Sequence, residues 1–119
     1  VDKTKRLLEA HVAGFQRAVR AGVKIAMGTD AGTPFNLHGE NARELERMVE
    51  HGLPAGEAVR SATSRAAELL NLEEDVGSIA VGRWADFLVV DGDPLEDVSA
   101  LGDPERIHAV YRAGRRVER

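Results

Sequence analysis

The residues best suited to chemistry in this sequence lie together in one short segment, residues 29–40, which reads TDAGTPFNLHGE. Asp30 offers a carboxylate that can accept and return a proton, and His38 offers an imidazole that can hydrogen-bond a substrate carbonyl or carboxylate. Thr33 and Asn36 lie between them and could line the same pocket, although both residue types also stabilise turns. The segment predicts a candidate site in which Asp30 does the chemistry.

Each of these residues also has a structural interpretation. A turn aspartate commonly bonds its own loop backbone, and for the sequence around Asp30 taken in isolation that interpretation is the better one. A backbone contact explains His38 equally well. Glu40 stands at the entry to a helix, where the dipole favours a carboxylate, and Asp86 lies far along the chain. The remaining histidines are interpreted as structural: His11, His51 and His108.

The elements before this segment predict where it is placed. Residues 23–28 (VKIAMG) form a short, mostly apolar run that ends at glycines, which is typical of a strand buried on both faces. From Leu7 to Val19 apolar residues recur at helical spacing, and Gly22 can end that helix in the left-handed conformation. A helix followed by such a strand is half of a parallel βαβ repeat. The segment is then a long loop at the carboxyl end of a strand, where α/β proteins place their chemistry.

The chain changes character near Glu73. The helical pattern before that point and the short apolar runs between glycine turns after it divide the sequence into residues 1–72 and residues 73–119. Helices are predicted over residues 41–51 and 54–72. Beyond the boundary we expect strands over 75–82 and 85–91, a loop or helical turn over 98–103, and a hairpin of 107–112 with 115–117.

Composition excludes several classes of function. The 119 residues are 43% hydrophobic and 30% charged, with a formal net charge of −4, so no clustered basic face is expected for nucleic acid. The sequence has no cysteine, which excludes disulfides and thiolate metal sites and makes the cytoplasm the default location. No apolar run approaches the roughly 20 residues that cross a bilayer, and no membrane association is expected.

Three stretches in this order resemble one family. Residues 28–34 (GTDAGTP) resemble the end of the eighth barrel strand in metal-dependent amidohydrolase-superfamily enzymes, and residues 57–67 resemble their final barrel helix. Residues 77–91 (GSIAVGRWADFLVVD) resemble the point where such chains leave the barrel for a small β-sandwich. Asn36 and His38 after the first stretch favour the imidazolonepropionase-like and prolidase-like branch.

The resemblance implies a fold and a reaction. The fold is α/β, incomplete in this chain: residues 1–72 would be the last strand and flanking helices of a (β/α)8 TIM-type barrel, and residues 73–119 part of a composite β-sandwich. The family binds one or two divalent metals, often zinc, and hydrolyses amide C–N bonds of dipeptides or small cyclic and aryl amides. Asp30 would be both metal ligand and proton shuttle, with Thr33, Asn36 and His38 at the substrate.

The rest of the family's metal site has no counterpart here. Its His-x-His pair, its bridging lysine and two further histidines match nothing in this sequence, and a complete barrel takes about 250 residues. The chain also opens on Val1. We therefore expect a fragment that is inactive alone, binds metal poorly, needs the remainder of the barrel, and self-associates through uncovered faces. The alternatives are a non-catalytic stand-alone module and a split subunit that binds a partner chain.

Overall fold

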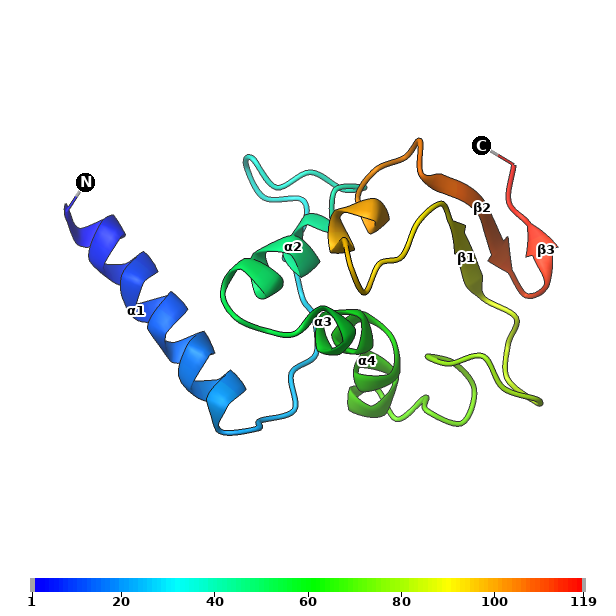
Figure 1. The fold of residues 1–119 in the computed structure, drawn as a ribbon, viewed down its shortest axis with the longest axis horizontal. Helices are drawn as coiled ribbons and strands as arrows, with labels where there is room; N and C mark the ends of the chain where they lie inside the picture. Colours follow the sequence, from blue (N-terminus) through cyan, green and yellow to red (C-terminus); the bar gives the residue numbers. More distant parts are fainter. Residues whose placement is uncertain (1, 119) are drawn as a thin grey trace.

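The computed structural model describes residues 2–118, as a row of helices followed by a small sheet (Figure 1). Helix α1 stands at one end of the molecule, α2 to α4 lie in the middle, and the sheet lies at the other end. The helices and strands are α1 (Asp2–Arg20), α2 (Arg43–Glu50), α3 (Ala55–Ala62), α4 (Ser64–Leu69), β1 (Phe87–Val90), the 3-10 helix η1 (Val98–Leu101), β2 (Ile107–Arg112) and β3 (Arg115–Arg116).

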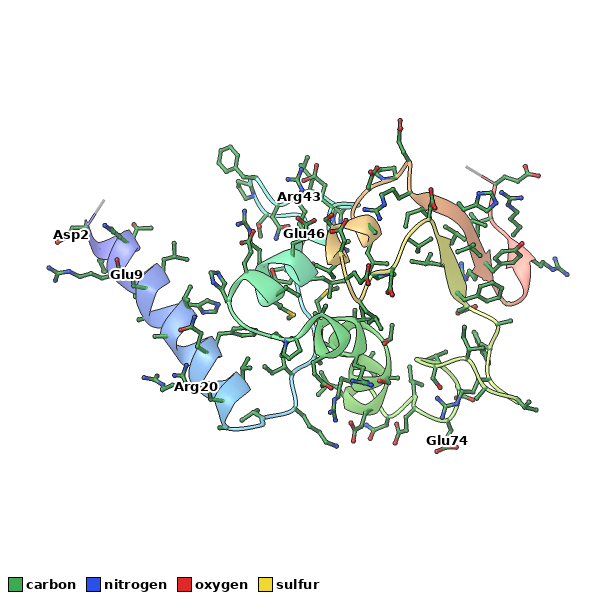
Figure 2. All side chains as sticks on the ribbon, in the orientation of Figure 1. Asp2, Glu9, Arg20, Arg43, Glu46 and Glu74 are labelled. Carbon is green, nitrogen blue, oxygen red and sulfur yellow. The ribbon has the colours of Figure 1, made fainter. Side chains whose placement is uncertain are left out.

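The predicted first helix is confirmed and ends as expected. Gly22 takes a φ of +69°, which glycine adopts at little cost. Its amide donates to the carbonyl of Val19 at 3.1 Å, and the amide of Val23 donates to that of Ala18 at 3.1 Å, so two of the last carbonyls find partners. Most of α1 is exposed: Leu7 is 62% accessible. Figure 2 shows the charged side chains Asp2, Glu9 and Arg20 spread along this helix.

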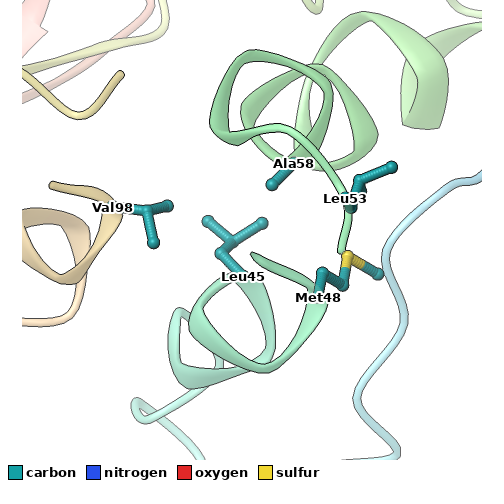
Figure 3. Packing of buried hydrophobic residues seen from close by; sticks show 5 residues of the cluster. All are labelled: Leu45, Met48, Leu53, Ala58 and Val98. Atoms are coloured by element: carbon teal, nitrogen blue, oxygen red, sulfur yellow. The ribbon is translucent and has the colours of Figure 1, made fainter. Parts of the chain in front are cut away.

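The hydrophobic core joins both predicted parts of the chain. Leu45 and Met48 of α2 meet Leu53, which precedes α3, and Ala58 within α3, and Val98 of η1 completes the cluster (Figure 3). All five side chains are less than 9% exposed. The carboxyl-terminal part of the chain therefore packs directly on the helices, and the boundary at residue 73 stays a prediction.

The strand predicted over residues 23–28 is wrong for this structure. These residues have no regular secondary structure, and within residues 2–118 no strand pairs with them. A strand is defined by the hydrogen-bond ladder to its neighbours, and the apolar pattern alone cannot supply those neighbours. The run is held from one side only, because Ile25 and Met27 pack against the core.

The single helix predicted over residues 54–72 is broken at Thr63, which has φ −124° and ψ −97°. The Thr63 hydroxyl donates to the carbonyl of Val59 at 2.8 Å, a local bond that competes with the helical pattern. Gly77 lies against this break, where a Cβ on it would approach the Thr63 carbonyl to 2.9 Å. Residues 75–82 form turns rather than the predicted strand, because Gly77 (φ +86°) and Gly82 (φ +88°) both leave the extended region.

The predicted strand over 85–91 and the following hairpin are confirmed as β1, β2 and β3. They form an antiparallel sheet in the order β1-β2-β3, with Phe87 opposite Tyr111 and their rings stacked 4.5 Å apart. The hairpin turn uses Ala113 at φ +49°. The Asp86 carboxylate accepts from the Ala113 amide at 2.6 Å, so its predicted structural role is supported by a direct bond. Over residues 2–118, no helix is both long and apolar enough to cross a membrane.

Candidate functional site

Asp30 follows an irregular segment that is bonded to the helices. The amide of Met27 donates to the carbonyl of the buried Ser61 in α3 at 2.9 Å. Lys24 forms an ion pair with Glu68 of α4, and this contact lowers the pKa of the Glu68 carboxyl. These contacts anchor the chain just before Asp30, so the loop at residues 29–40 begins from a positioned backbone.

The Asp30 side chain is exposed and its backbone lies in the left-handed region, with φ +48°. That conformation costs an ordinary L-residue about 1–2 kcal/mol, and aspartate tolerates it better than most. Throughout the described residues 2–118, no hydrogen bond or ion pair engages its carboxylate. The turn-aspartate interpretation predicted a bond to the loop backbone, and this structure contains no such bond.

The loop closes around Asn36. The Gly32 amide donates to the Asn36 carbonyl at 2.8 Å, and the Asn36 amide donates to the Thr33 carbonyl at 3.0 Å. The side-chain amide of Asn36 donates to the carbonyl of Thr29. Asn36 therefore bonds the backbone on both sides of Asp30. A turn-stabilising role for Asn36 was one of the two interpretations of the sequence, but its partner Thr29 was not predicted, because only the path of the loop brings residue 36 back to residue 29.

His38 lies against the same loop. A Cβ built on Gly32 would come within 2.8 Å of the His38 Nε2 atom, so the imidazole occupies the space that only glycine leaves open. Gly32 itself has φ +102°. His38 and Thr33 are both exposed, while Asn36 is half-buried. The structure thus brings Gly32, Asn36 and His38 together in the loop that follows Asp30. The substrate-binding roles of Thr33, Asn36 and His38 stay predictions.

This arrangement does not make a metal site by itself. Among residues 2–118 no group of three histidine, aspartate or glutamate side chains lies close enough together to hold an ion. Asp30 offers one carboxylate, and a stable divalent site needs several ligands in fixed geometry. The chain can contribute a ligand to such a site but cannot hold the metal with the residues that the structure describes.

Comparison with known proteins decides the family. The profile of the amidohydrolase family matches residues 1–117. The chain belongs to the amidohydrolase family. The prediction from the three sequence stretches is confirmed at that level, and the mixed α/β structure matches solved amidohydrolases over most of its length.

Individual amidohydrolases resemble the chain in sequence and in structure. Ochratoxinase of Aspergillus niger is 31% identical over 115 residues, which cover 95% of this chain and 23% of that protein. Its crystal structure superposes with a TM-score of 0.85 over 97% of this chain. Imidazolonepropionase of Micrococcus luteus is 32% identical over 113 residues, covering 90% of this chain and 27% of that enzyme.

A solved Xaa-Pro dipeptidase with methionine bound in its active site is 44% identical, with a TM-score of 0.81, over 90% of this chain and 25% of that one. Both named branches, imidazolonepropionase and prolidase, therefore occur among the similar proteins, as the sequence predicted. The chain spans about a quarter of the length of these amidohydrolases.

Proposed function

We propose that this chain forms the carboxyl-terminal part of an amidohydrolase that cleaves amide C–N bonds of dipeptides or small cyclic and aryl amides. The observation that carries the proposal is Asp30, an exposed carboxylate that no group within residues 2–118 neutralises or bonds, at the start of the loop at residues 29–40. The 44% identity to a Xaa-Pro dipeptidase supports a peptide-like amide as the substrate class.

In the proposed reaction Asp30 acts first as a general base and then as a general acid. It accepts a proton from the water that attacks the amide carbon, and it returns that proton to the nitrogen as the C–N bond breaks. The divalent metal expected in this family, one or two ions and zinc by preference, would supply an activated water and an electrophile for the carbonyl. Asp30 would be this chain's ligand to it, and the other ligands must come from polypeptide outside these residues.

The proposed partner is therefore the remainder of the amidohydrolase barrel. Exposed apolar side chains mark the faces where it would pack, including Leu7 on α1 (62% accessible) and Trp84 (62%) and Leu88 (50%) near the sheet. The same faces would drive self-association of the 119-residue chain kept alone. The cytoplasmic location stays a prediction.

Deamination is the second candidate reaction. Guanine deaminase of Escherichia coli is 31% identical over 123 residues, covering 86% of this chain and 28% of that enzyme. A deaminase also breaks a C–N bond with water, so the same Asp30 chemistry would serve. The choice between the two lies in pocket walls beyond the loop at residues 29–40.

The test is an activity panel on the complete protein that carries this chain. Xaa-Pro dipeptides and an N-acyl aromatic amide represent amide hydrolysis, and guanine and adenine represent deamination. Release of free amino acid from the amides, with loss of activity after chelation of divalent metal, is the expected result. Ammonia from the purines with intact amides would favour the second candidate. The 119-residue chain alone should be inactive, and hydrolysis by it unaided would contradict the proposal.

A further inference from the structure

In the loop at residues 29–38, the residue whose carboxylate makes no bond also has an unusual backbone conformation. Asp30 has φ +48°, and Phe35 in the same loop has φ +66°. A chain free to relax would leave this region at a residue other than glycine unless surrounding bonds over-determine it. The bonds that hold this loop conformation can be identified, because each of them has the same residue as donor or acceptor.

That residue is Asn36. Its side-chain amide donates to the carbonyl of Thr29, which is the peptide group that joins Thr29 to Asp30. Its backbone carbonyl accepts from the Gly32 amide at 2.8 Å, two residues beyond Asp30. Its backbone amide donates to the carbonyl of Thr33 at 3.0 Å. Asn36 therefore fixes the orientation of the peptide that enters Asp30 and the position of the chain that leaves it.

The other groups around this loop do not duplicate the task. Thr33 and His38 are exposed, and neither side chain bonds the backbone within residues 2–118. The nearest attachment before the loop is the bond from the Met27 amide to Ser61, which lies three residues ahead of Asp30. Without the Asn36 amide, the peptide of Thr29 can rotate about its flanking bonds.

We infer that Asn36 is a positioning residue, whose side-chain amide sets the direction of the Asp30 carboxylate by holding the Thr29 carbonyl. The inference rests on the proposed function for its catalytic consequence, but its structural consequence is independent of any activity. A reacting group displaced by about 1 Å can cost about 100-fold in rate. Loss of the Asn36 amide should therefore lower kcat, with KM little changed.

The experiment compares Asn36→Ala and Asn36→Asp in the complete protein. Alanine deletes the donor, and aspartate keeps the shape of the side chain but presents oxygen to the Thr29 carbonyl in place of N–H. Asn41→Ala is the matched control, since Asn41 is exposed and, in the described chain, its side chain bonds nothing. We expect kcat to fall about 10- to 100-fold in both Asn36 variants, and to stay within about two-fold of wild type in the control. A gentler substitution, Asn36→Gln, keeps the amide and should recover part of the loss.

A crystal structure of Asn36→Ala separates this inference from the proposed function. We expect φ at Asp30 to leave the left-handed region in that variant and to remain near +48° in Asn41→Ala. If wild type hydrolyses no amide, the proposed function fails and the backbone angle alone tests the inference. The inference is overturned if Asp30 keeps its conformation in Asn36→Ala. Equal kcat values for the Asn36 variants and the control, in an active enzyme, would also overturn it.

Discussion

Two regions of the molecule use aspartate in turns, and they use it differently. Between residues 86 and 103 four of the five aspartates accept from backbone amides, and Asp91 is the exception. Asp86 accepts from Ala113 at 2.6 Å, Asp93 from Leu95 at 2.8 Å, Asp97 from Ser99 at 3.1 Å and Asp103 from Glu105 at 2.9 Å. In the loop at residues 29–38 the Asp30 carboxylate has no such partner anywhere in residues 2–118. The residue type is the same, so the difference lies in what the surrounding backbone demands.

A turn aspartate that stabilises its own loop gains that bond at little cost and needs no special conformation. The left-handed backbone of Asp30 costs free energy, and no local bond of its side chain offsets that cost. Residues held in that way are expected at sites where a ligand completes the arrangement. Asp91 also makes no side-chain bond, but among the described residues only Asp30 combines an unbonded carboxylate with a positive φ. The candidate functional aspartate is therefore recognised by both features together, and the structural ones by their bonds.

The largest effect is expected from substitution of Asp30, the aspartate whose carboxylate makes no bond. Asp30→Asn keeps the size of the side chain and suits the left-handed backbone equally well. It removes the charge and the proton-accepting oxygen, so kcat/KM in the complete protein should fall about 10²- to 10⁴-fold. In the metal-free protein the melting temperature should change little, because the carboxylate makes no bond within the described chain. A variant that is fully active, or one that fails to fold, would contradict this assignment.

A smaller effect tests whether His38 binds the substrate. Gly32→Ala and Gly39→Ala both place a side chain on a left-handed glycine, with φ +102° and +92°. Only the first meets a neighbour: its Cβ would lie 2.8 Å from the His38 imidazole, whereas nothing lies within 4 Å of the second. If His38 bonds the substrate, displacing it costs about 1 kcal/mol of binding, which is roughly a 5- to 10-fold rise in KM. Steady-state kinetics of the two variants make the test, and equal KM values would remove His38 from the substrate site.

The third effect is on stability and falls in the other region. Asp86→Ala deletes the acceptor that holds the Ala113 amide in the hairpin turn. We expect a loss of about 1 kcal/mol, visible as a lower melting temperature, with kcat unchanged. The two substitutions should therefore have separate effects: Asp30→Asn lowers activity, and Asp86→Ala lowers stability. A drop in kcat for Asp86→Ala with no change in melting temperature would reverse the two assignments.

The smallest effect is a pH dependence at Asp97. Hydrogen bonds from Ser99, and then the contact with Arg106 at 2.6 Å, lower the pKa of the Asp97 carboxyl below its ordinary value of 3.8. A lowered pKa in the folded state means that its stabilising contribution is present above the ordinary pKa and is lost as pH falls through the folded value. The melting temperature of wild type should therefore fall more steeply below about pH 4 than that of Asp97→Asn. Parallel curves for the two proteins would show that this exposed carboxyl contributes nothing measurable.

Local pattern predicted a good part of this fold. The first helix and its glycine end followed from apolar spacing and from Gly22, and the hairpin of β2 and β3 followed from the two runs on either side of the turn Ala113-Gly114. These elements depend on contacts within a few residues of each other. The family also followed from the sequence, because three separate stretches stand in the order and at the spacing that the family uses.

The features that escaped prediction depend on contacts between distant residues. The run at residues 23–28 has the composition of a buried strand, but a strand requires neighbours that the described chain does not provide. The helix break at Thr63 is contacted by Gly77, fourteen positions further along the chain, and that contact is not visible in the local pattern. At the site, Asp30 was predicted from its context, while the bond from Asn36 back to Thr29 was not, since the two residues are seven positions apart in an irregular loop.

The most direct test of the account is a crystal structure of the complete protein grown with zinc. We predict that an Asp30 carboxylate oxygen lies about 2.0–2.2 Å from a bound ion, with the remaining ligands drawn from residues outside this chain. A zinc ion coordinated elsewhere, with the Asp30 carboxylate more than about 4 Å away and still exposed to solvent, would contradict it.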